Sequence, residues 1–509
     1  MRLRASIWVC SDEEHAEEHA MGEEQATLFR LDFNRSVRVE ARRERLSADA
    51  GALLLRSLPD RLGFASLVRG HLDDERDAAR VSHDFVELLR THLLLWAQGW
   101  MDQRDADLLR SDRVLGLAIS SRRGTTPVTG GGAGAAAGLA SQPTLSRVLA
   151  ALASDENRSG LLAGLLDLAE RRRGPGARRL SEVVLDVDSL PLEVHGSQPG
   201  SAWNAHYGYR CYHPLVLRWE GGDFLAAQLR AGNVHTADGA LAFVIPALLW
   251  AKRQAERVWL RMDAGFPESE LLATLEDEGV RYVARLRANA RLEKLAAPFL
   301  RHPPGRPPAE RRLWTHELLY RARTWERERR IVLVVLERPH AQGELFLDHF
   351  FLLTNVGAEE VCGRALLERY RARGEAERDF GDWKSTLSLA LSSAPRPKSH
   401  YRGRLVSAPE PTTDSFAANE ARLLLSLWAA NLMRAGAELV SRGERQMLTR
   451  QRFRQLVLKV AARVLIHGRR LTLVIEADRA QLWQRFWREL ARRHPARGSP
   501  ALQALPIPA

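Results

Sequence analysis

Two hydrophobic patterns divide the chain. Over residues 47–117, apolar residues recur every three or four positions with arginines and acids between them, which predicts a helical domain. From residue 181 onward the pattern changes to β-branched runs, and residues 181–190, 258–262 and 282–286 are predicted strands. Here strands first follow one another and then alternate with helices. This order predicts an α/β fold with a mixed sheet.

The pattern of residue types changes again after residue 286. Between about residues 290 and 355, short strand candidates are separated by proline, glycine and charge clusters, which predicts an all-β insertion. Helices are expected to resume near residue 363 and to include a basic amphipathic stretch at 452–470. The glycine- and alanine-rich residues 129–138 have the composition of a flexible linker.

The composition indicates which kind of partner the protein binds and in which compartment it is expected. The chain has 509 residues and a net charge of +12, with 75 basic and 63 acidic residues, and this favours a polyanionic partner, nucleic acid first. Three cysteines far apart in the sequence argue against a disulfide scaffold. The best apolar run, residues 239–251, contains Pro246 and is shorter than the ~20 residues that a bilayer requires. With acids among the first 30 residues in place of a signal peptide, we expect a cytoplasmic protein with no membrane partner.

Aspartates stand at the ends of two predicted strands. Asp186 and Asp188 are two residues apart, so on a strand they point to the same face, and Asp263 closes a second strand. Ligands of open α/β sheets bind at the carboxyl ends of the strands. Carboxylates gathered there suit Mg²⁺ or Mn²⁺. The alternative is that these aspartates only cap the helices that follow.

A second group of polar residues shares one side of a predicted helix. Tyr370, Arg373, Glu377 and Lys384 lie within about 60° of one another at 100° per residue. The stripe offers an acid for a metal, two cations for phosphates and an aromatic ring for a base or sugar. A solvated charged face is the usual meaning of such a stripe, but tyrosine is rare in this chain and lysine occurs only five times, which favours a functional one.

The same spacing carries a family resemblance. Tyr370-x2-Arg373-x3-Glu377-x6-Lys384 resembles the signature around the third acid of DDE transposases from bacterial insertion sequences. Segments of the chain from about residue 40 to 475 are similar to the insertion-sequence-thirteen-eighty family, in the same order: residues 49–56, 139–147, 195–198, 204–207, 212–215 and 351–355.

The resemblance implies an RNase H-like catalytic core, with a mixed sheet, that is interrupted by the all-β insertion. Its catalytic and metal-binding acids would be Asp188, Asp263 and Glu377, holding two Mg²⁺ (or Mn²⁺) ions, while Tyr370, Arg373 and Lys384 would contact DNA. Leu190 stands where the family usually has threonine, so Asp186 remains an alternative to Asp188.

The implied activity is metal-dependent cleavage at transposon ends followed by strand transfer into target DNA, which is cut-and-paste transposition. The implied partners are double-stranded DNA, both terminal inverted repeats and target, and further copies of the chain assembled on the DNA ends. Two alternatives stay open: a decayed or domesticated DNA-binding protein without catalysis, and a nuclease with the same core but no strand transfer.

These inferences together give a domain plan. A polar tail (1–34) is followed by a helical DNA-end-binding domain (35–123) and a linker (124–138). The core is formed by residues 139–286 and 361–475, the second part containing the third-acid helix and basic helices, and the β-strand insertion (287–360) lies between these parts. The chain closes with a C-terminal helix and tail (476–509).

Overall fold

The computed structural model describes residues 27–31, 34–40, 45–77, 79–120, 138–174, 176–196, 198–303, 310–339, 345–387, 391, 400–401, 404–405, 415–467 and 470–495. Two compact units are present, residues 1–45 and 46–509. In the first unit, β1 (Thr27–Leu31) pairs antiparallel with β2 (Asn34–Glu40), so strands begin within the segment expected to be a polar tail. The expected linker lies outside the described residues except for Gly138.

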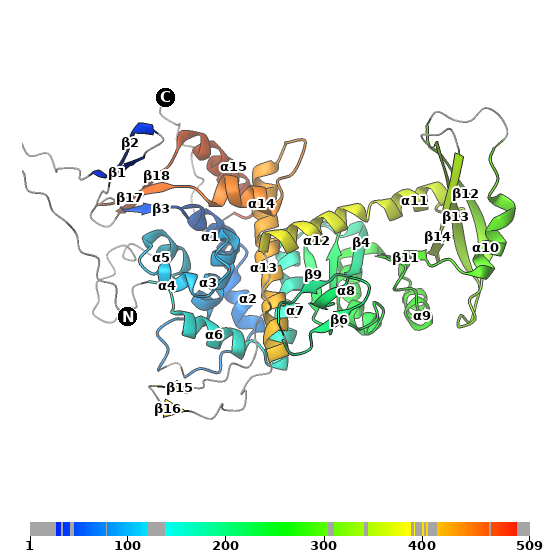
Figure 1. The fold of residues 1–509 in the computed structure, drawn as a ribbon, viewed down its shortest axis with the longest axis horizontal. Coiled ribbons are helices and arrows are strands. Elements are labelled where there is room, and N and C mark those ends of the chain that lie inside the picture. Colours follow the sequence, from blue (N-terminus) through cyan, green and yellow to red (C-terminus); the bar gives the residue numbers. More distant parts are fainter. Residues whose placement is uncertain are drawn as a thin grey trace, which may run out of the picture. The chain divides into compact units, whose positions relative to one another are not determined.

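Helices build the first part of the second unit, as the spacing of apolar residues predicts. They are α1 (Gly51–Arg61), α2 (Phe64–His71), α3 (Phe85–Gln98), α4 (Asp105–Leu108), α5 (Arg113–Ile119), α6 (Gln142–Ala151) and α7 (Asp155–Arg173). The long helix α13 (Ser415–Ser441) runs through their midst and joins their hydrophobic core (Figure 1). Among the described helices only α13 is long and apolar enough to cross a membrane, and its apolar window is 89% buried inside the protein. It is therefore the core helix of this region.

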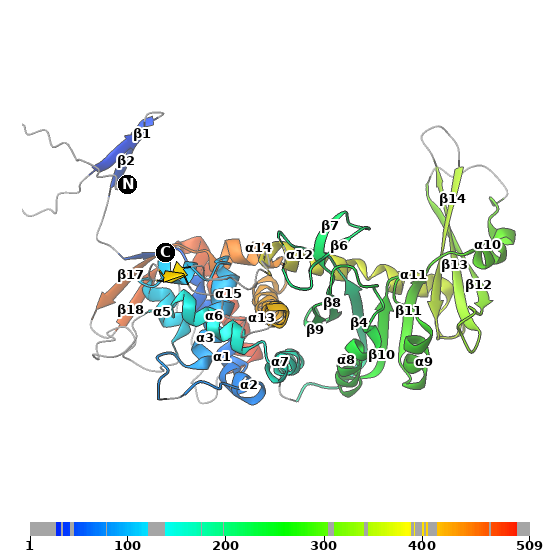
Figure 2. The same ribbon diagram turned by 60° about the horizontal axis from the view of Figure 1, so that its bottom comes forward.

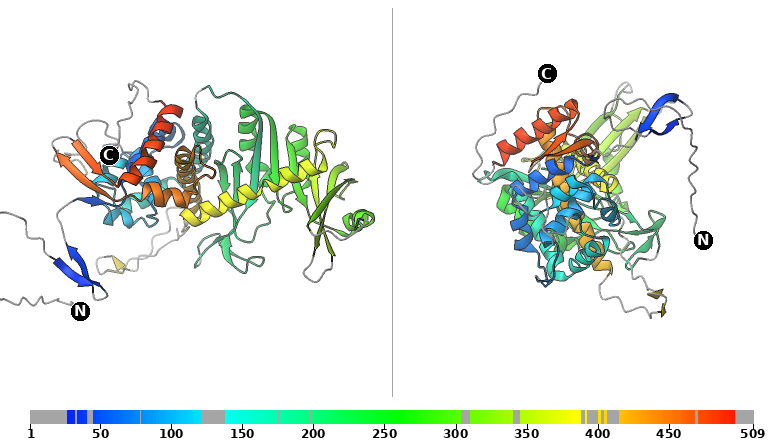
Figure 3. Two further views of the ribbon diagram at one scale, coloured as in Figure 1. Left: turned by 90° about the horizontal axis from the view of Figure 1, so that it is seen from above. Right: turned by 90° about the vertical axis from the view of Figure 1, so that its left-hand side faces the viewer.

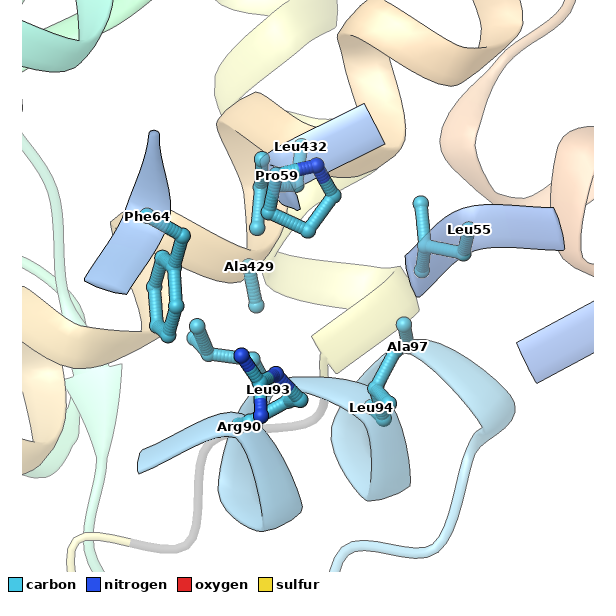
Figure 4. Close-up of a pocket in the computed structure, with 9 residues that line it drawn as sticks. All are labelled: Leu55, Pro59, Phe64, Arg90, Leu93, Leu94, Ala97, Ala429 and Leu432. Atoms are coloured by element: carbon cyan, nitrogen blue, oxygen red, sulfur yellow. The ribbon is translucent and has the colours of Figure 1, made fainter. Parts of the chain in front are cut away.

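The helical core is closely packed. A void of only about 10 Å³ remains between α1, α2, α3 and α13, and Figure 4 shows the side chains around it. Its lining is apolar except for Arg90, whose guanidinium donates to the carbonyl of Ile119 at 2.8 Å. A space of this size is at the lower limit for one water molecule.

An eight-stranded mixed sheet forms the second part, in the order β12-β13-β14-β11-β10-β4-β8-β9. The central strand β4 (Leu180–Ser189) runs antiparallel to β8 (Leu215–Trp219), which pairs with β9 (Phe224–Gln228). On its other side β4 runs parallel to β10 (Ala255–Met262), which is parallel to β11 (Arg281–Leu286). The predicted strands 181–190, 258–262 and 282–286 and the predicted mixed sheet are confirmed.

Helices cover both faces of this sheet (Figure 2). Val183, Leu185 and Val187 of β4 pack in the hydrophobic cluster that includes α8 (Ala240–Gln254) and α9 (Ser269–Asp277). Val184 faces the other way, into the cluster under α11 (Gly363–Arg371). Since side chains alternate along a strand, Asp186 and Asp188 share the face of Val184. Both aspartates therefore point toward the side of α11 and of α12 (Gly374–Leu387).

The carboxyl ends of β4, β10 and β11 meet at one edge because the three strands are parallel. A small sheet in the order β5-β7-β6 follows β4 at this edge, formed by β5 (Leu192–Glu193), β6 (Ala202–Asn204) and β7 (Tyr209–Tyr212).

The insertion between Asp263 and Glu377 contains strands but is not all-β. It includes α10 (Ala290–Ala296) and a short 3₁₀ turn, Ala297–Phe299. Its strands β12 (Arg312–Tyr320), β13 (Arg329–Pro339) and β14 (Leu345–Thr354) continue the main sheet, because β14 pairs with β11. The pairing with β11 stops at Phe351, so the start of β14, paired with β13, projects past the carboxyl edge of the sheet.

The predicted basic helix at 452–470 is wrong. The helix α14 (Arg450–Phe453) continues as a π-helical turn, Arg454–Leu458 (η2), and is followed by the hairpin of β17 (Ala462–His467) and β18 (Arg470–Val474). Ala462 and Val464 are buried while Arg463 and Leu465 are exposed, which is the two-residue period of a strand.

The strand β3 (Leu46–Ser47) pairs with β17 of that hairpin. The chain then ends its described part with α15 (Ala477–Arg493), and a separate two-stranded sheet is formed by β15 (His400–Tyr401) and β16 (Arg404–Leu405). Figure 3 shows α15 beside α13, at the end of the unit away from the insertion.

Candidate active site

Two of the three predicted acids stand at the carboxyl ends of neighbouring parallel strands. Asp188 is the penultimate residue of β4, and Asp263 directly follows β10. Both side chains are partly exposed. The Asp188 carboxylate accepts a hydrogen bond from the backbone amide of Ser189 at 2.8 Å. The Asp263 carboxylate has no hydrogen-bonding or ion-pair partner among the described residues.

Asp186 has a different surrounding. Its carboxylate accepts two hydrogen bonds from the guanidinium of Arg261 on β10, at 2.6 and 2.8 Å, and its side chain is 1% exposed. Arg261 also donates to the carbonyl of Arg369 on α11 at 3.1 Å. Both oxygens of Asp186 are therefore engaged in joining two strands to a helix.

The stripe Tyr370–Lys384 does not lie on one continuous helix. α11 ends at Arg371 and α12 begins at Gly374, and the amide of Arg373 bonds to the carbonyl of Tyr370, three residues back instead of four. This tightened turn directs the Arg373 side chain into the protein, where it is 9% exposed.

Arg373 joins two of the predicted acids. Its guanidinium forms an ion pair with the carboxylate of Asp188, with an N–O distance of 2.7 Å, and donates a hydrogen bond to the carboxylate of Glu377 at 2.7 Å. Glu377 itself is 61% exposed. The structure thus brings Asp188, Arg373 and Glu377 into direct contact, from β4, the turn between helices, and α12.

Buried ion pairs fix the rotation of α12 about its axis. Asp379 of α12 pairs with Arg218 of β8 at 3.1 Å, and Asp382 pairs with Arg450 of α14 at 3.1 Å. Both arginines are almost fully buried. With Asp379 and Asp382 held in this way, Glu377 is left toward Arg373 and the sheet edge.

The pKa values of Asp188 and Arg373 are both shifted by burial and by the charges around them. Burial raises the pKa of Asp188 to about 6; Arg373 opposes the shift, and the charges of Asp263 and Glu377 add to it. Burial alone would lower the pKa of Arg373, but the neighbouring carboxylates, Asp188 first, raise it overall. Asp188 and Glu377 thus act on Arg373 by direct contact, while Asp263 acts on it only through its charge.

The remaining predicted residues lie at the borders of this site. Tyr370 is half-buried against the cluster under α11, where burial raises its pKa. Lys384 is exposed, and its Nζ donates to the carbonyl of Pro191, just after β4, at 2.6 Å. The lysine therefore ties α12 to the loop that follows the first acid.

A known protein family matches most of the chain. A family model described as "transposase DDE domain group 1" matches residues 29–493, which is most of the chain. The chain belongs to this transposase family. Among solved structures it is similar to a cryo-EM structure of a piggyBac transposase synaptic complex with hairpin DNA, with 11% identity and a TM-score of 0.34 over 90% of this chain and 84% of that one. No curated protein matches the chain.

The three predicted acids of this DDE transposase have the chemistry of ligands for a divalent metal. Asp188, Asp263 and Glu377 offer hard carboxylate oxygens of the kind that Mg²⁺ and Mn²⁺ prefer. In the described part of the chain, no three acidic, histidine or cysteine side chains are close enough together to hold an ion as they stand. In the structure, Arg373 supplies the positive charge between Asp188 and Glu377.

One residue near the acids of this transposase was not singled out from the sequence. Tyr207, in the turn between β6 and β7, is half-buried, and burial followed by the charge of Asp188 raises its pKa, with Asp263 contributing further. Its ring lies at 5.9 Å from that of Tyr209, nearly parallel to it. The only sequence signal was its place in the family-like segment 204–207.

Proposed function

We propose that this chain is a cut-and-paste transposase that cleaves DNA at the ends of an insertion sequence and joins the freed ends to target DNA. The insertion-sequence-thirteen-eighty family and a bacterial cytoplasm are the proposed context. The observation that supports the proposal is the contact of Arg373 with both Asp188 and Glu377 at the carboxyl edge of the sheet, where Asp263 follows the neighbouring strand β10.

The proposed core is RNase H-like. The strand order β9-β8-β4-β10-β11 supports it, since the first three strands are antiparallel and the last three are parallel. In this proposal Asp188 is the first acid. The bidentate pair between Asp186 and Arg261 supports that choice, because a carboxylate engaged on both oxygens is a poor metal ligand.

The proposed cofactor is Mg²⁺ or Mn²⁺, bound by Asp188, Asp263 and Glu377. Such a metal activates a water or a 3′-hydroxyl and stabilises the leaving oxygen. Arg373 and Lys384 would release their present partners and bind phosphates of the DNA strand, Arg373 through its planar fork and Lys384 as a point charge. Tyr370 would stack on, or bond to, the terminal nucleotide.

A strand-transfer assay tests the proposal. The substrate is the DNA that flanks the coding sequence, pre-cut at the mapped border, and the acceptor is a supercoiled plasmid. We expect joined products that require Mg²⁺. Cleavage at the border without joined products would indicate a nuclease with the same core, and DNA binding without cleavage would indicate a domesticated binding protein.

A further inference from the structure

A pocket of about 300 Å³ lies beside Asp263, outside the contacts already described. Its polar lining consists of Asp263, Arg285, Arg287 and His349, and Phe350 is among its apolar side chains. The pocket opens where β11 ends and where β14 projects past the sheet edge. It is thus bounded by the core on one side and by the insertion on the other.

Strand register places this pocket level with the second acid. Met262 of β10 pairs with Ala284 of β11, so continuing the register by one residue sets Asp263 beside Arg285. The neighbouring parallel strands β4, β10 and β11 therefore present Asp188, Asp263 and Arg285 along one edge. In open α/β sheets this edge binds ligands.

The two arginines of the pocket lack acidic partners. Arg285 and Arg287 are both exposed, and neither forms an ion pair with any described residue. Around the acids the arginines are paired instead: Arg218 with Asp379, Arg261 with Asp186, and Arg373 with Asp188. The guanidinium groups of the pocket are therefore not held in ion pairs by the described protein, although the carboxylate of Asp263 lines the same pocket.

The side chains around the arginines restrict their positions. The guanidinium of Arg285 lies over the ring of Phe350, 5.2 Å from its centroid, and such a cation–π contact orients the guanidinium plane. His349, the residue before Phe350 on β14, forms a hydrogen bond with Glu293 of α10 at 2.8 Å. Arg285 is thus held in the pocket lining by an aromatic ring, and its guanidinium has no hydrogen-bond or ion-pair partner among the described residues.

We propose that this pocket is a phosphate-binding subsite, in which Arg285 and Arg287 bind phosphodiester oxygens of the DNA strand next to the bond that the acids cut. Unpaired guanidinium groups match the geometry of phosphate oxygens. Contacts of this kind position a strand and do not read its sequence. The inference rests on the proposed function and adds a subsite for the DNA strand on the insertion side of Asp263.

Salt-dependent DNA binding tests the subsite. Binding of the full-length protein to a fluorescein-labelled 30-base-pair duplex is followed by anisotropy over a range of NaCl concentrations. A phosphate contact contributes about 0.9 to the slope of log affinity against log salt. We expect Arg285→Ala and Arg287→Ala each to lower that slope by about 0.9, with Arg285→Lys retaining most of it.

The matched control is Arg253→Ala. Arg253 lies near the end of α8, before β10 begins and thus at the opposite edge of the sheet, and it is exposed without an ion pair to a described residue. Its loss should leave the slope unchanged. The circular dichroism spectrum of every variant should match that of the wild type. A wild-type slope and affinity in both Arg285→Ala and Arg287→Ala would overturn the subsite.

Cleavage of DNA that carries the element border with its flanks distinguishes failure of the subsite from failure of the proposed function. If wild-type protein binds and cuts while Arg285→Ala and Arg287→Ala do both equally well, the subsite is wrong and the proposed function stands. If wild-type protein neither cuts nor joins DNA under any divalent cation, the proposed function is wrong, and the subsite falls with it.

Discussion

The carboxylate of Asp186 and the guanidinium of Arg261 form a two-bond ion pair between neighbouring strands, and both side chains are at least 96% buried. Removing one partner of such a pair leaves a buried, uncompensated charge, which costs about 3–5 kcal/mol. We therefore expect Asp186→Asn to lower the free energy of unfolding by that order, measured by urea denaturation. Asp188→Asn, which removes a partly exposed carboxylate, should change it far less and should abolish DNA cleavage.

A double variant tests whether the loss of stability in Asp186→Asn comes from the unpaired charge of Arg261. Asp186→Leu combined with Arg261→Met removes both charges and keeps the volume, so stability should recover relative to Asp186→Asn. If Asp186→Asn is as stable as the wild type and loses cleavage, then Asp186 belongs to the catalytic acids and the assignment of Asp188 moves.

Glu377 and Glu375 provide a matched pair on α12. Glu377 contacts Arg373 at 2.7 Å. Glu375 is 65% exposed, and its one ion-pair partner among the described residues is Arg378, at 4.0 Å. Exposed pairs of that kind stabilise a protein by at most about 1 kcal/mol. We expect Glu377→Ala to remove nicking and strand transfer, and Glu375→Ala to leave both within a few-fold of wild type. Loss of activity in Glu375→Ala alone would mean that α12 is rotated from the position described here.

Arg373 and a divalent cation should compete for the same carboxylates. With Arg373 replaced by alanine, Asp188 and Glu377 lose their shared positive charge, and we expect the DNA-free protein to bind Mn²⁺ about tenfold more tightly, by electron paramagnetic resonance titration. Arg371→Ala is the control, since in the part of the chain that the structure describes Arg371 pairs only with the exposed Glu368. Weaker Mn²⁺ binding in Arg373→Ala would show that the arginine organises the acids for the metal.

The sequence predicted those features of the site that depend on residues adjacent in the chain. A β-branched run that ends in acids predicted β4 and Asp188, and the run before Asp263 predicted β10, because these patterns depend only on neighbouring residues. The pairing of Asp186 with Arg261 could not be predicted, since it depends on the register of two strands that are far apart in sequence. The same holds for Arg373, whose inward direction follows from the tightened turn after Tyr370.

The wrong prediction of a basic helix at 452–470 has a similar cause. Residues 462–467 are rich in basic and apolar side chains that fit a helical and a strand period over so short a length. Pairing with β18 and β3 decides in favour of the strand. Arg454, expected on the basic helix, instead donates to the carbonyls of Trp96 and Ala97, both at 2.8 Å.

Stability should depend on pH through His92 in the helical core. Burial first, and the charge of Arg422 second, lower the pKa of this 2%-exposed imidazole from 6.5 to about 3. Below pH 6.5 the unfolded chain binds a proton that the folded protein excludes, so stability is lost as the pH falls. From pH 7 to pH 5 this group alone should cost about 2 kcal/mol.

Urea denaturation of wild type and His92→Gln at both pH values isolates that contribution. The variant lacks the titrating ring, so its loss of stability between pH 7 and pH 5 should be smaller by about 2 kcal/mol. Equal losses in the two proteins would show that His92 can be protonated without cost in the folded state.

The most direct test of the three-acid site is cleavage of a plasmid that carries the coding sequence with its native flanks. With Mg²⁺, wild-type protein should nick the DNA at one fixed position at each border, and chelation with EDTA should stop it. Asp188→Asn, Asp263→Ala and Glu377→Ala should each bind the border DNA with near wild-type affinity and leave it uncut. Cutting at the wild-type rate by any one of the three, in a folded protein, would contradict the account.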